Sequence, residues 1–224
     1  MAVEKQKYSK KSRTHTTYKL KDGTTIPAVT TVLKLIKPAD PLIHWAWDLG
    51  MRGIDYKKHR DDLAEIGVLA HSMILCHLKK KDCDTGEYSK RQIDKAENCF
   101  LKYLEWEKHH KIKPILVEKP LISEDWGYGG QPDFYGKIDG ILTLADFKTG
   151  KRIYDEHLYQ IAAYRGLVLE AGYQIDQYLV LNIGRDETEK FEEVKRVDLA
   201  LEERIFYHAL EIYRTKKEIK ERRT

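Results

Sequence analysis

The segment from Gly129 to Lys148 constrains the fold of this chain more than any other stretch. It reads GGQPDFYGKIDGILTLADFK, in which two runs of apolar and aromatic residues flank the pair Asp139-Gly140. A glycine in that pair tolerates the positive φ of a tight hairpin loop, and the flanking runs are typical of strands. The sequence therefore predicts a β-hairpin with its turn at Asp139-Gly140.

A second constraint comes from the spacing of Asp146 and Lys148 on the later of these two strands. Because side chains alternate between the faces of a sheet, residues two apart leave the same face, and pairing of the strands brings Asp133 beside them. A bare Asp-x-Lys pair is usually an exposed strand pair. Here Asp146 follows an apolar run, residues 141–145, where an unpaired charge is costly and therefore usually has a partner. We expect two carboxylates and one ammonium group to converge.

Such a group of side chains has a definite chemistry. Carboxylate oxygens are ligands that Mg²⁺ and Mn²⁺ prefer, and a Mg²⁺ ion usually takes one or two protein carboxylates together with water and substrate phosphate. A bound ion polarises a phosphoryl oxygen and lowers the pKa of a bound water, while Lys148 can orient that water or balance charge on the phosphorane. The pattern therefore favours hydrolysis of phosphodiester bonds.

The same residues resemble the motifs of the PD-(D/E)xK nuclease superfamily, in its RecB-like branch. The matching positions are Pro132-Asp133 for the first metal-ligand motif, Asp146 to Thr149 for the D-x-K-T motif, and Gln160 with Tyr164 for the Q-x-x-x-Y motif. The resemblance implies an α/β fold with a restriction-endonuclease-like core, a mixed central sheet flanked by helices, and a helical amino-terminal subdomain. It implies catalytic roles for Asp133, Asp146, Lys148, Gln160 and Tyr164.

A histidine upstream of the hairpin extends this resemblance. Residues 56–80 are predicted to form a long helix, since apolar side chains recur at helical spacing. Glycine lowers helix stability by about 1 kcal/mol, so a mid-helix Gly67 predicts close approach to the sheet, with His71 one turn later on the same side. Spacing alone favours packing roles for His71 and His77, but Gly67 to His71 matches the G-x-x-x-H motif of the branch. The resemblance implies Mg²⁺ or Mn²⁺ bound by His71, Asp133, Asp146 and the backbone carbonyl of Phe147.

A looser match covers part of the amino-terminal half. Residues 26–33, followed by Trp45 and Trp47 in a predicted helix, resemble the mitochondrial genome-maintenance exonucleases and their phage and bacterial relatives. This implies a DNA exonuclease that acts on single-stranded ends. Two alternatives stay open: a structure-specific endonuclease of the same superfamily, and a non-catalytic nucleic-acid-binding module, which should have lost at least one of Asp133, Asp146 and Lys148. Trp45 and Trp47 are expected to pack in the core or in an interface.

Composition sets broad limits on these interpretations. A chain of 224 residues with 42% hydrophobic content suits one large domain, and its net charge of +4 permits a polyanionic partner such as DNA without requiring one. Three cysteines, Cys76, Cys83 and Cys99, are too few for a disulfide framework or a four-cysteine iron–sulfur cluster. No apolar run reaches the length of a membrane span. We expect a protein of the reducing cytoplasm, and the resemblance to phage and bacterial exonucleases implies a bacterium or a phage-infected cell. The oligomeric state is left open.

The remaining segments predict how a single nuclease domain, residues 1–224, is organised. Residues 1–16 form a flexible basic tail, residues 28–111 a mainly helical part, residues 113–198 the sheet-containing catalytic core, and residues 199–224 a carboxy-terminal helix. A hairpin is expected over residues 17–27, and a short helix over residues 32–36 capped by Thr30 or Thr31. The final helix, capped by Asp198, ends in a basic cluster that fits either a solvated face or a phosphate contact.

Several residues of the catalytic half have two interpretations. A strand is predicted over residues 115–122, and its Glu118 is either a surface residue or a further carboxylate of the site. Trp126 and Tyr128 suit core packing or stacking on a nucleobase. Gln160 and Tyr164 lie at positions i and i+4 of a helix that begins near residue 155, where they can hydrogen-bond phosphate and hold the catalytic lysine.

Overall fold

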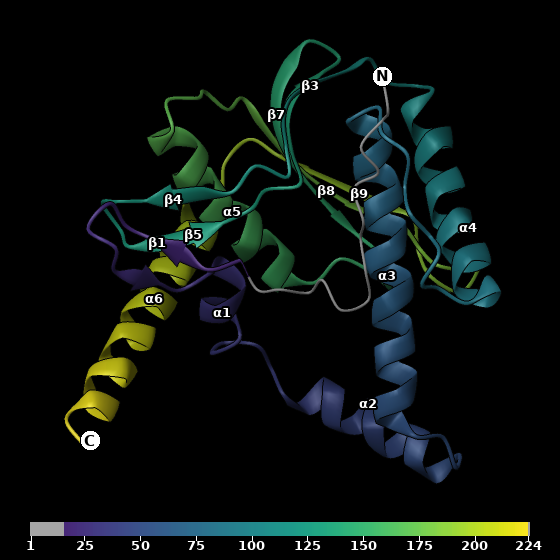
Figure 1. Cartoon of the computed structure of the whole chain (residues 1–224), viewed down its shortest axis with the longest axis horizontal. Coiled ribbons are helices and arrows are strands. Elements are labelled where there is room, and N and C mark those ends of the chain that lie inside the picture. The colour runs from purple at the N-terminus through teal and green to yellow at the C-terminus, as the bar shows by residue number, and fades with distance from the viewer. Residues whose placement is uncertain (1–15, 224) are drawn as a thin grey trace.

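A five-stranded mixed sheet forms the centre of the structure, a computed structural model that describes residues 16–223 (Figure 1). The strands lie in the order β3 (Ile112–Val117), β6 (Phe134–Ile138), β7 (Ile141–Lys148), β8 (Gln177–Asn182) and β9 (Glu192–Arg196). The neighbours β7 and β8 run parallel, and the other neighbouring pairs are antiparallel. The basic tail predicted over residues 1–16 lies outside the described residues except for its last position.

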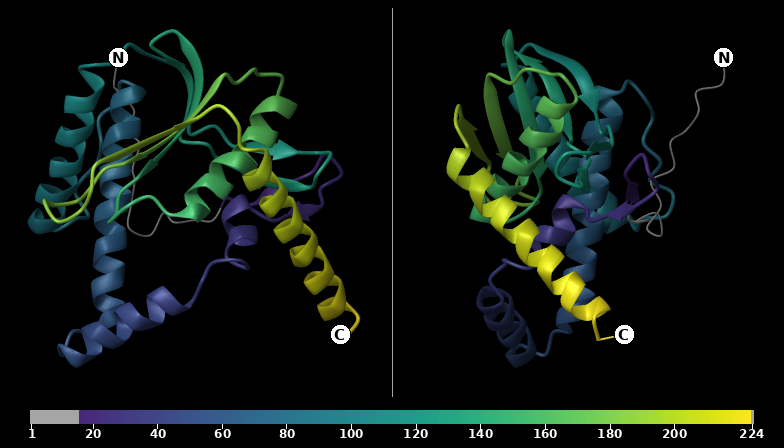
Figure 2. Two further views of the ribbon diagram at one scale, coloured as in Figure 1. Left: turned by 180° about the vertical axis from the view of Figure 1, so that it is seen from behind. Right: turned by 90° about the vertical axis from the view of Figure 1, so that its left-hand side faces the viewer.

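Helices cover both faces of this sheet, as the two views of Figure 2 show. One face is covered by α3 (Tyr56–Leu78) and α4 (Lys90–Glu107), and the other by α1 (Val29–Leu33), α5 (Asp155–Glu170) and α6 (Ala200–Glu221). Along β7, Leu144 packs in the core on the α5 side, while Ala145 and Phe147 pack in the core on the α3 side. This architecture confirms the predicted α/β class, a mixed central sheet flanked by helices, and it fits a restriction-endonuclease-like core.

Side-chain alternation also decides which layer the polar residues of β7 face. Asp146 and Lys148 are in step with Leu144 and therefore leave the sheet on the α5 side. Parallel strands need a crossover connection, and here α5 joins β7 to β8. The crossover places a helix directly over the two residues that the motif singles out.

The turn between β6 and β7 lies at the predicted position. Asp139 and Gly140 have φ angles of 53° and 90°, and the strand register pairs Ile138 with Ile141. Two successive residues with positive φ are what a two-residue hairpin loop of type I′ requires. The prediction of a hairpin with its turn at this pair is confirmed.

The prediction of one continuous strand over residues 115–122 is wrong, because these residues belong to two strands. β3 ends at Val117, and Glu118 has a φ of 51°, which turns the chain out of the central sheet. Pro120 follows two residues later and has no N–H to donate to a strand ladder. The next strand, β4 (Leu121–Ser123), pairs instead with β5 (Tyr128–Gly130) in a separate two-stranded sheet.

The start of the first helix also differs from the prediction. The hairpin expected over residues 17–27 is confirmed by β1 (Tyr18–Lys19) and β2 (Thr25–Ile26), which pair antiparallel. The chain then enters α1 at Val29 rather than at residue 32, because the Ala28 carbonyl already accepts hydrogen bonds from the backbone of Thr31 and Val32. The caps predicted at Thr30 or Thr31 are therefore wrong, since these threonines lie inside the helix.

A similar shift occurs at the start of α6. Its N-cap residue is Leu199, which makes no side-chain cap, rather than the predicted Asp198. The Asp198 carboxylate instead accepts a hydrogen bond from the backbone N–H of Ala200 (3.0 Å). The aspartate still satisfies a backbone donor of the first turn, one residue out of the predicted register.

The helix α2 (Asp40–Met51) extends away from the sheet and joins α1 to α3 (Figure 1). Trp45 packs against α3, with ring centroids 6.0 Å from Tyr56 and 5.8 Å from His59. Trp47 is 65% exposed, which excludes the core for this residue and leaves the predicted packing in an interface untested. Among residues 16–223, no helix combines the length and the apolar content needed to cross a membrane.

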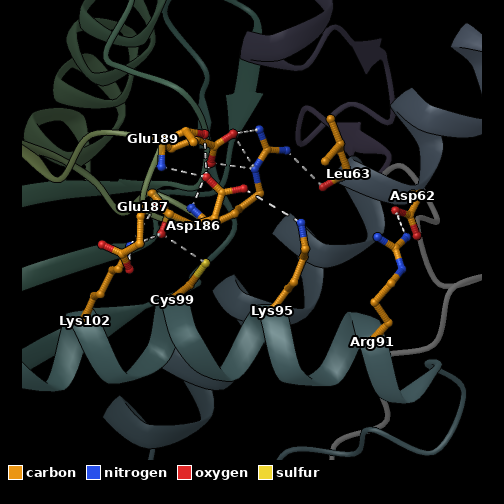
Figure 3. Close-up of polar contacts among 12 residues, drawn as sticks. Asp62, Leu63, Arg91, Lys95, Cys99, Lys102, Asp186, Glu187 and Glu189 are labelled. Atoms are coloured by element: carbon orange, nitrogen blue, oxygen red, sulfur yellow. Dashed lines mark hydrogen bonds and ion pairs between the residues drawn. The ribbon is translucent and has the colours of Figure 1, made fainter. Parts of the chain in front are cut away.

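The loop between β8 and β9 fastens the sheet to the α3–α4 layer (Figure 3). Lys102 of α4 donates to the backbone carbonyls of Gly184 (3.3 Å) and Asp186 (3.0 Å). Arg185 pairs with Glu189 inside the loop and also donates to the Leu63 carbonyl of α3 (3.4 Å). These contacts fix the position of α3 relative to the end of β8, and hence relative to the adjacent end of β7.

Candidate active site

Asp133 and Asp146 meet at the open end of the β6–β7 hairpin. The strand register pairs Phe134 with Ala145, so the next opposed residues are Asp133 and Asp146. The backbone N–H of Phe147 donates to Oδ2 of Asp133 (2.8 Å), which fixes this carboxylate against β7. Both aspartates are buried, so the two carboxylates predicted to converge do so inside the protein.

The Asp146 carboxylate has one oxygen without a partner among residues 16–223. Lys148 Nζ lies 2.7 Å from Asp146 Oδ2 as an ion pair, whereas no donor of the described residues reaches Oδ1. Burial raises the pKa of Asp146 to about 6; Lys148 opposes this shift and Asp133 adds to it. Buried polar atoms usually have partners, so Oδ1 is suited to an added ligand such as a cation.

A chain of hydrogen bonds holds the Lys148 ammonium group from the α5 side. Lys148 Nζ donates to Oε1 of Gln160 (2.9 Å), and Nε2 of Gln160 donates to the hydroxyl oxygen of Tyr164 (2.8 Å). Burial raises the pKa of Tyr164 well above its ordinary value, so its hydroxyl stays neutral. Gly130 makes room for the ring, because a Cβ atom there would lie 2.7 Å from Tyr164 Cε1. The structure thus brings together the three residues that the motifs grouped.

His71 reaches the carboxylate pair from α3. Its Nε2 lies 2.9 Å from Oδ1 of Asp133. Burial alone would lower the pKa of His71, but the carboxylates of Asp133, Glu118 and Asp146, with Asp133 the largest contributor, together raise this pKa above its ordinary value. Burial likewise would raise the pKa of Asp133, and the positive charges of His71 and Lys148 lower it instead. His71 therefore serves, in this structure, as the hydrogen-bonding partner of Asp133.

Glu118 borders the site without joining the carboxylate pair. Its backbone N–H donates to the Asp133 carbonyl (3.1 Å), and its carboxylate forms an ion pair with Lys79 of α3 (2.8 Å). The charge of Glu118 also contributes to raising the pKa of His71. Glu118 was predicted to be either a surface residue or a further carboxylate of the site, and neither interpretation describes it fully. Its role in the structure is to fix the backbone of Asp133.

His157 is a residue of this region that the motifs did not indicate. It lies three residues before Gln160 and hence on the same side of α5. Its Nδ1 accepts a hydrogen bond from the backbone N–H of Tyr154 (3.3 Å). Burial, together with the charges of Lys148 and Lys37, lowers the pKa of His157 to about 3. The signal in the sequence was its spacing from Gln160, which a motif search does not use.

The two aromatic residues considered for base stacking, Trp126 and Tyr128, have different environments in the structure. Tyr128 is fully buried, and its hydroxyl donates to the Ala163 carbonyl (2.9 Å), so it belongs to the core. Trp126 is exposed on one side and stacks on Tyr207 of α6, with ring centroids 4.3 Å apart. Core packing is thus correct for Tyr128.

The donor set fits a divalent cation that solvent and substrate complete. Within residues 16–223, no three His, Cys, Asp or Glu side chains form a ready-made metal cage. A Mg²⁺ ion needs only one or two protein carboxylates, and Asp146 offers the buried Oδ1, which has no partner among the described residues, beside Asp133. His71 Nε2 is directed at Asp133, so coordination by His71 requires that contact to open.

Comparison with known proteins finds distant structural likeness only. No protein-family model matches the chain, and no curated protein matches its sequence. Among 20 similar solved structures is a candidate exonuclease from Eubacterium rectale, with 11% identity and a TM-score of 0.48; the match covers 67% of this chain and 65% of that one. Another is LHK-Exo in complex with dAMP, with 16% identity and a TM-score of 0.31; the match covers 71% of this chain and 91% of that one. The function of this chain is therefore inferred from its own residues.

Proposed function

We propose that this chain is a metal-dependent DNA exonuclease that hydrolyses phosphodiester bonds at single-stranded ends. The observation that carries the proposal is the buried Asp146 carboxylate, whose Oδ1 meets no donor among residues 16–223, beside Asp133 and the Lys148 ammonium group. Two carboxylates and a lysine held by Gln160 and Tyr164 also support placing the chain in the PD-(D/E)xK superfamily, in its RecB-like branch. The preference for single-stranded ends is the implication of the looser exonuclease resemblance.

The proposed cofactor is Mg²⁺ or Mn²⁺, held by Asp133, Asp146, the backbone carbonyl of Phe147 and, by family resemblance, His71. Carboxylate oxygens suit these hard cations, and the neutral imidazole of a histidine is tolerated better by Mn²⁺ than by Mg²⁺. When bound, the ion would polarise a phosphoryl oxygen and lower the pKa of a water. The carboxylates are held in advance for this role, Asp133 by the Phe147 N–H and Asp146 by burial in β7.

Lys148 would act on the reacting groups directly. Its ammonium group has three N–H donors, of which one is taken by Gln160 and another lies toward Asp146. The remaining donor is available for the attacking water or a non-bridging phosphate oxygen. Negative charge spreads over the phosphoryl oxygens as the water oxygen bonds to phosphorus and the bond to the departing oxygen breaks, and a fixed ammonium group stabilises that charge.

The test is cleavage of an end-labelled single-stranded oligodeoxynucleotide with different ions. We expect Mg²⁺ and Mn²⁺ to support turnover, Ca²⁺ to permit binding with little turnover, and EDTA to stop cleavage. Asp146→Asn should lower turnover by about a thousandfold while DNA binding persists. Full activity in EDTA would refute the metal mechanism, and binding without cleavage under every ion would favour a non-catalytic module.

A matched control for this variant lies in the same hairpin. Asp139→Asn makes the same chemical change at the β6–β7 turn, where Asn tolerates positive φ and can still accept the hydrogen bond from the Lys111 N–H. Asp139→Asn should retain full turnover. A comparable loss in both variants would mean that damage to the hairpin, and not loss of the Asp146 carboxylate, explains the effect.

A further inference from the structure

The outer face of α6 carries apolar residues that the other residues of the range 16–223 leave partly exposed. The inner face packs on α1 and α5 through three buried residues, Phe206, Ala209 and Leu210. The carboxyl-terminal turns extend past the body of the protein (Figures 1 and 2). On the outer side Ile205, Ile212 and Ile219 are 38%, 46% and 45% exposed. Scattered exposed isoleucines are common, but a row along one helix points to a partner.

The row has the period of a coiled coil. Ile205, Ile212 and Ile219 are spaced by seven residues, so they occupy one heptad position along α6. Leu201, 68% exposed, lies four residues before Ile205 on the same side of the helix. If the isoleucines take position a, then the buried residues Phe206 and Leu210 take b and f, which face away from the seam, and the buried Ala209 takes e at its edge. Packing among the described residues therefore leaves the a and d positions themselves exposed.

The charged residues that flank this seam have a complementary order. In the same heptad frame Glu211 and Glu218 occupy position g, and Lys216 occupies position e. In a parallel pair of helices, a g residue faces the e residue five positions later on the partner helix. Two copies of α6 would therefore pair Glu211 of each copy with Lys216 of the other.

The same residues argue against an antiparallel pair. Antiparallel helices bring g positions opposite g positions, which would oppose Glu211 and Glu218 of one copy to those of the other. Like charges so placed repel. β-Branched residues at position a also favour two strands in a parallel coil. The sequence of the outer face thus specifies both the occupant and its direction.

We propose that the outer face of α6 is a dimer interface, in which a second copy of this chain packs its own α6 in parallel about a two-fold axis. Such an interface is isologous, with the same residues contributed by both subunits. The d positions within the helix are Leu201, His208 and Thr215, of which two are weaker than the leucine that stabilises coiled coils. The dimer is therefore reversible and depends on protein concentration. This proposal is independent of the proposed nuclease activity.

The test uses sedimentation equilibrium of the full chain over a range of concentrations. We expect a reversible monomer–dimer equilibrium, and Ile212→Asp should raise the dimer dissociation constant by about a hundredfold, because each dimer loses two buried isoleucines. The matched control is Lys220→Glu. Lys220 also occupies position b, on the side of α6 away from the seam, and it is exposed because the last turns extend past the protein body. This variant should leave the equilibrium unchanged. A wild-type chain that stays monomeric at about 0.5 mM would overturn the proposal, since any interface tighter than millimolar would be populated there.

Charge reversal tests the pairing of Glu211 with Lys216 across the interface and does not depend on the stability of Ile212→Asp. A chain with Glu211→Lys, and a second chain with Lys216→Glu, should each dimerise more weakly than the wild type because both copies of this pair become repulsive. An equimolar mixture should form a heterodimer at wild-type concentrations. Dimers of either variant alone that are as tight as those of the wild type, or a mixture that does not associate, would overturn the dimer interface.

Discussion

Gly67 of α3 and Thr149, just after β7, are so close that a Cβ atom on Gly67 would lie 2.6 Å from Thr149 Oγ1. This confirms the close approach that a mid-helix glycine predicted. The contact joins the helix that carries His71 to the end of the strand that carries Asp146 and Lys148. The distance between the two layers at this point is set by the absence of one side chain.

The first prediction concerns this contact. Gly67→Ala should lower the free energy of unfolding by about 1 kcal/mol, because displacement of Thr149 outweighs the gain in helix propensity. In a Thr149→Ala background the same substitution should stabilise the protein by about 0.5 to 1 kcal/mol, since the hydroxyl is gone and the propensity gain remains. Urea denaturation of the four proteins measures both effects. Equal effects of Gly67→Ala in the two backgrounds would contradict a contact between the two side chains.

The second prediction concerns the hydrogen bonds that hold Lys148. Gln160→Ala should lower turnover by about a hundredfold, because Gln160 contacts the ammonium group directly. Tyr164→Phe should cost only about tenfold, since its hydroxyl acts on Lys148 through Gln160. Single-turnover rates on a single-stranded oligonucleotide separate these losses from binding. A larger effect for Tyr164→Phe than for Gln160→Ala would contradict this order of action.

The parts of the fold that the sequence predicted correctly depend on local rules. The hairpin turn at Asp139 and Gly140 follows from the positive φ that its two residues must adopt, and strand alternation then places Asp146 and Lys148 on one face. The grouping of Asp133 with Asp146 follows from the same register. These inferences need no knowledge of distant segments.

The predictions were wrong where a contact with a distant residue or with a backbone group determines the structure. Glu118 turns the chain out of the sheet at a positive φ, and its carboxylate pairs with Lys79, which is not local in sequence. The Ala28 carbonyl starts α1 earlier than the threonine side chains suggested. His157 carries no motif and is recognised only once α5 lies beside Lys148. Such features depend on tertiary contacts rather than on residue patterns.

A third prediction concerns His71. Its contact with Asp133 orients one of the two carboxylates, so His71→Ala should lower turnover in Mg²⁺, though by less than Asp146→Asn. Adding Mn²⁺ should restore part of the activity, because Mn²⁺ binds mixed ligand sets with less demand on geometry than Mg²⁺. Metal titrations of turnover in the wild type and the variant measure the effect. Identical titration curves would restrict His71 to a packing role.

A fourth prediction concerns stability in acid. Burial lowers the pKa of His157 to about 3, below the ordinary 6.5 that it has in the unfolded chain. Between these pH values the unfolded state binds more protons, so the contribution of His157 to stability is lost as the pH falls below about 6.5. The slope from one group cannot exceed about 1.4 kcal/mol per pH unit.

His157→Gln isolates this effect, because glutamine does not titrate and can still accept the hydrogen bond from the Tyr154 N–H. The free energy of unfolding of the variant should depend less on pH between about 6.5 and 5 than that of the wild type. Urea denaturation at several pH values gives both curves. Parallel curves would mean that another group is responsible.

The last prediction separates an exonuclease from an endonuclease. The proposed activity requires a free end, so a linear single strand should be degraded, whereas a covalently closed circle of the same sequence should survive. Binding of either DNA should weaken steeply with added salt, because lysine and arginine side chains that contact phosphates release counterions. Asp146→Asn supplies the matched control, since it should bind both substrates and cut neither. Equal cutting of the circle and the linear strand by the wild type would eliminate the requirement for an end and favour the structure-specific endonuclease.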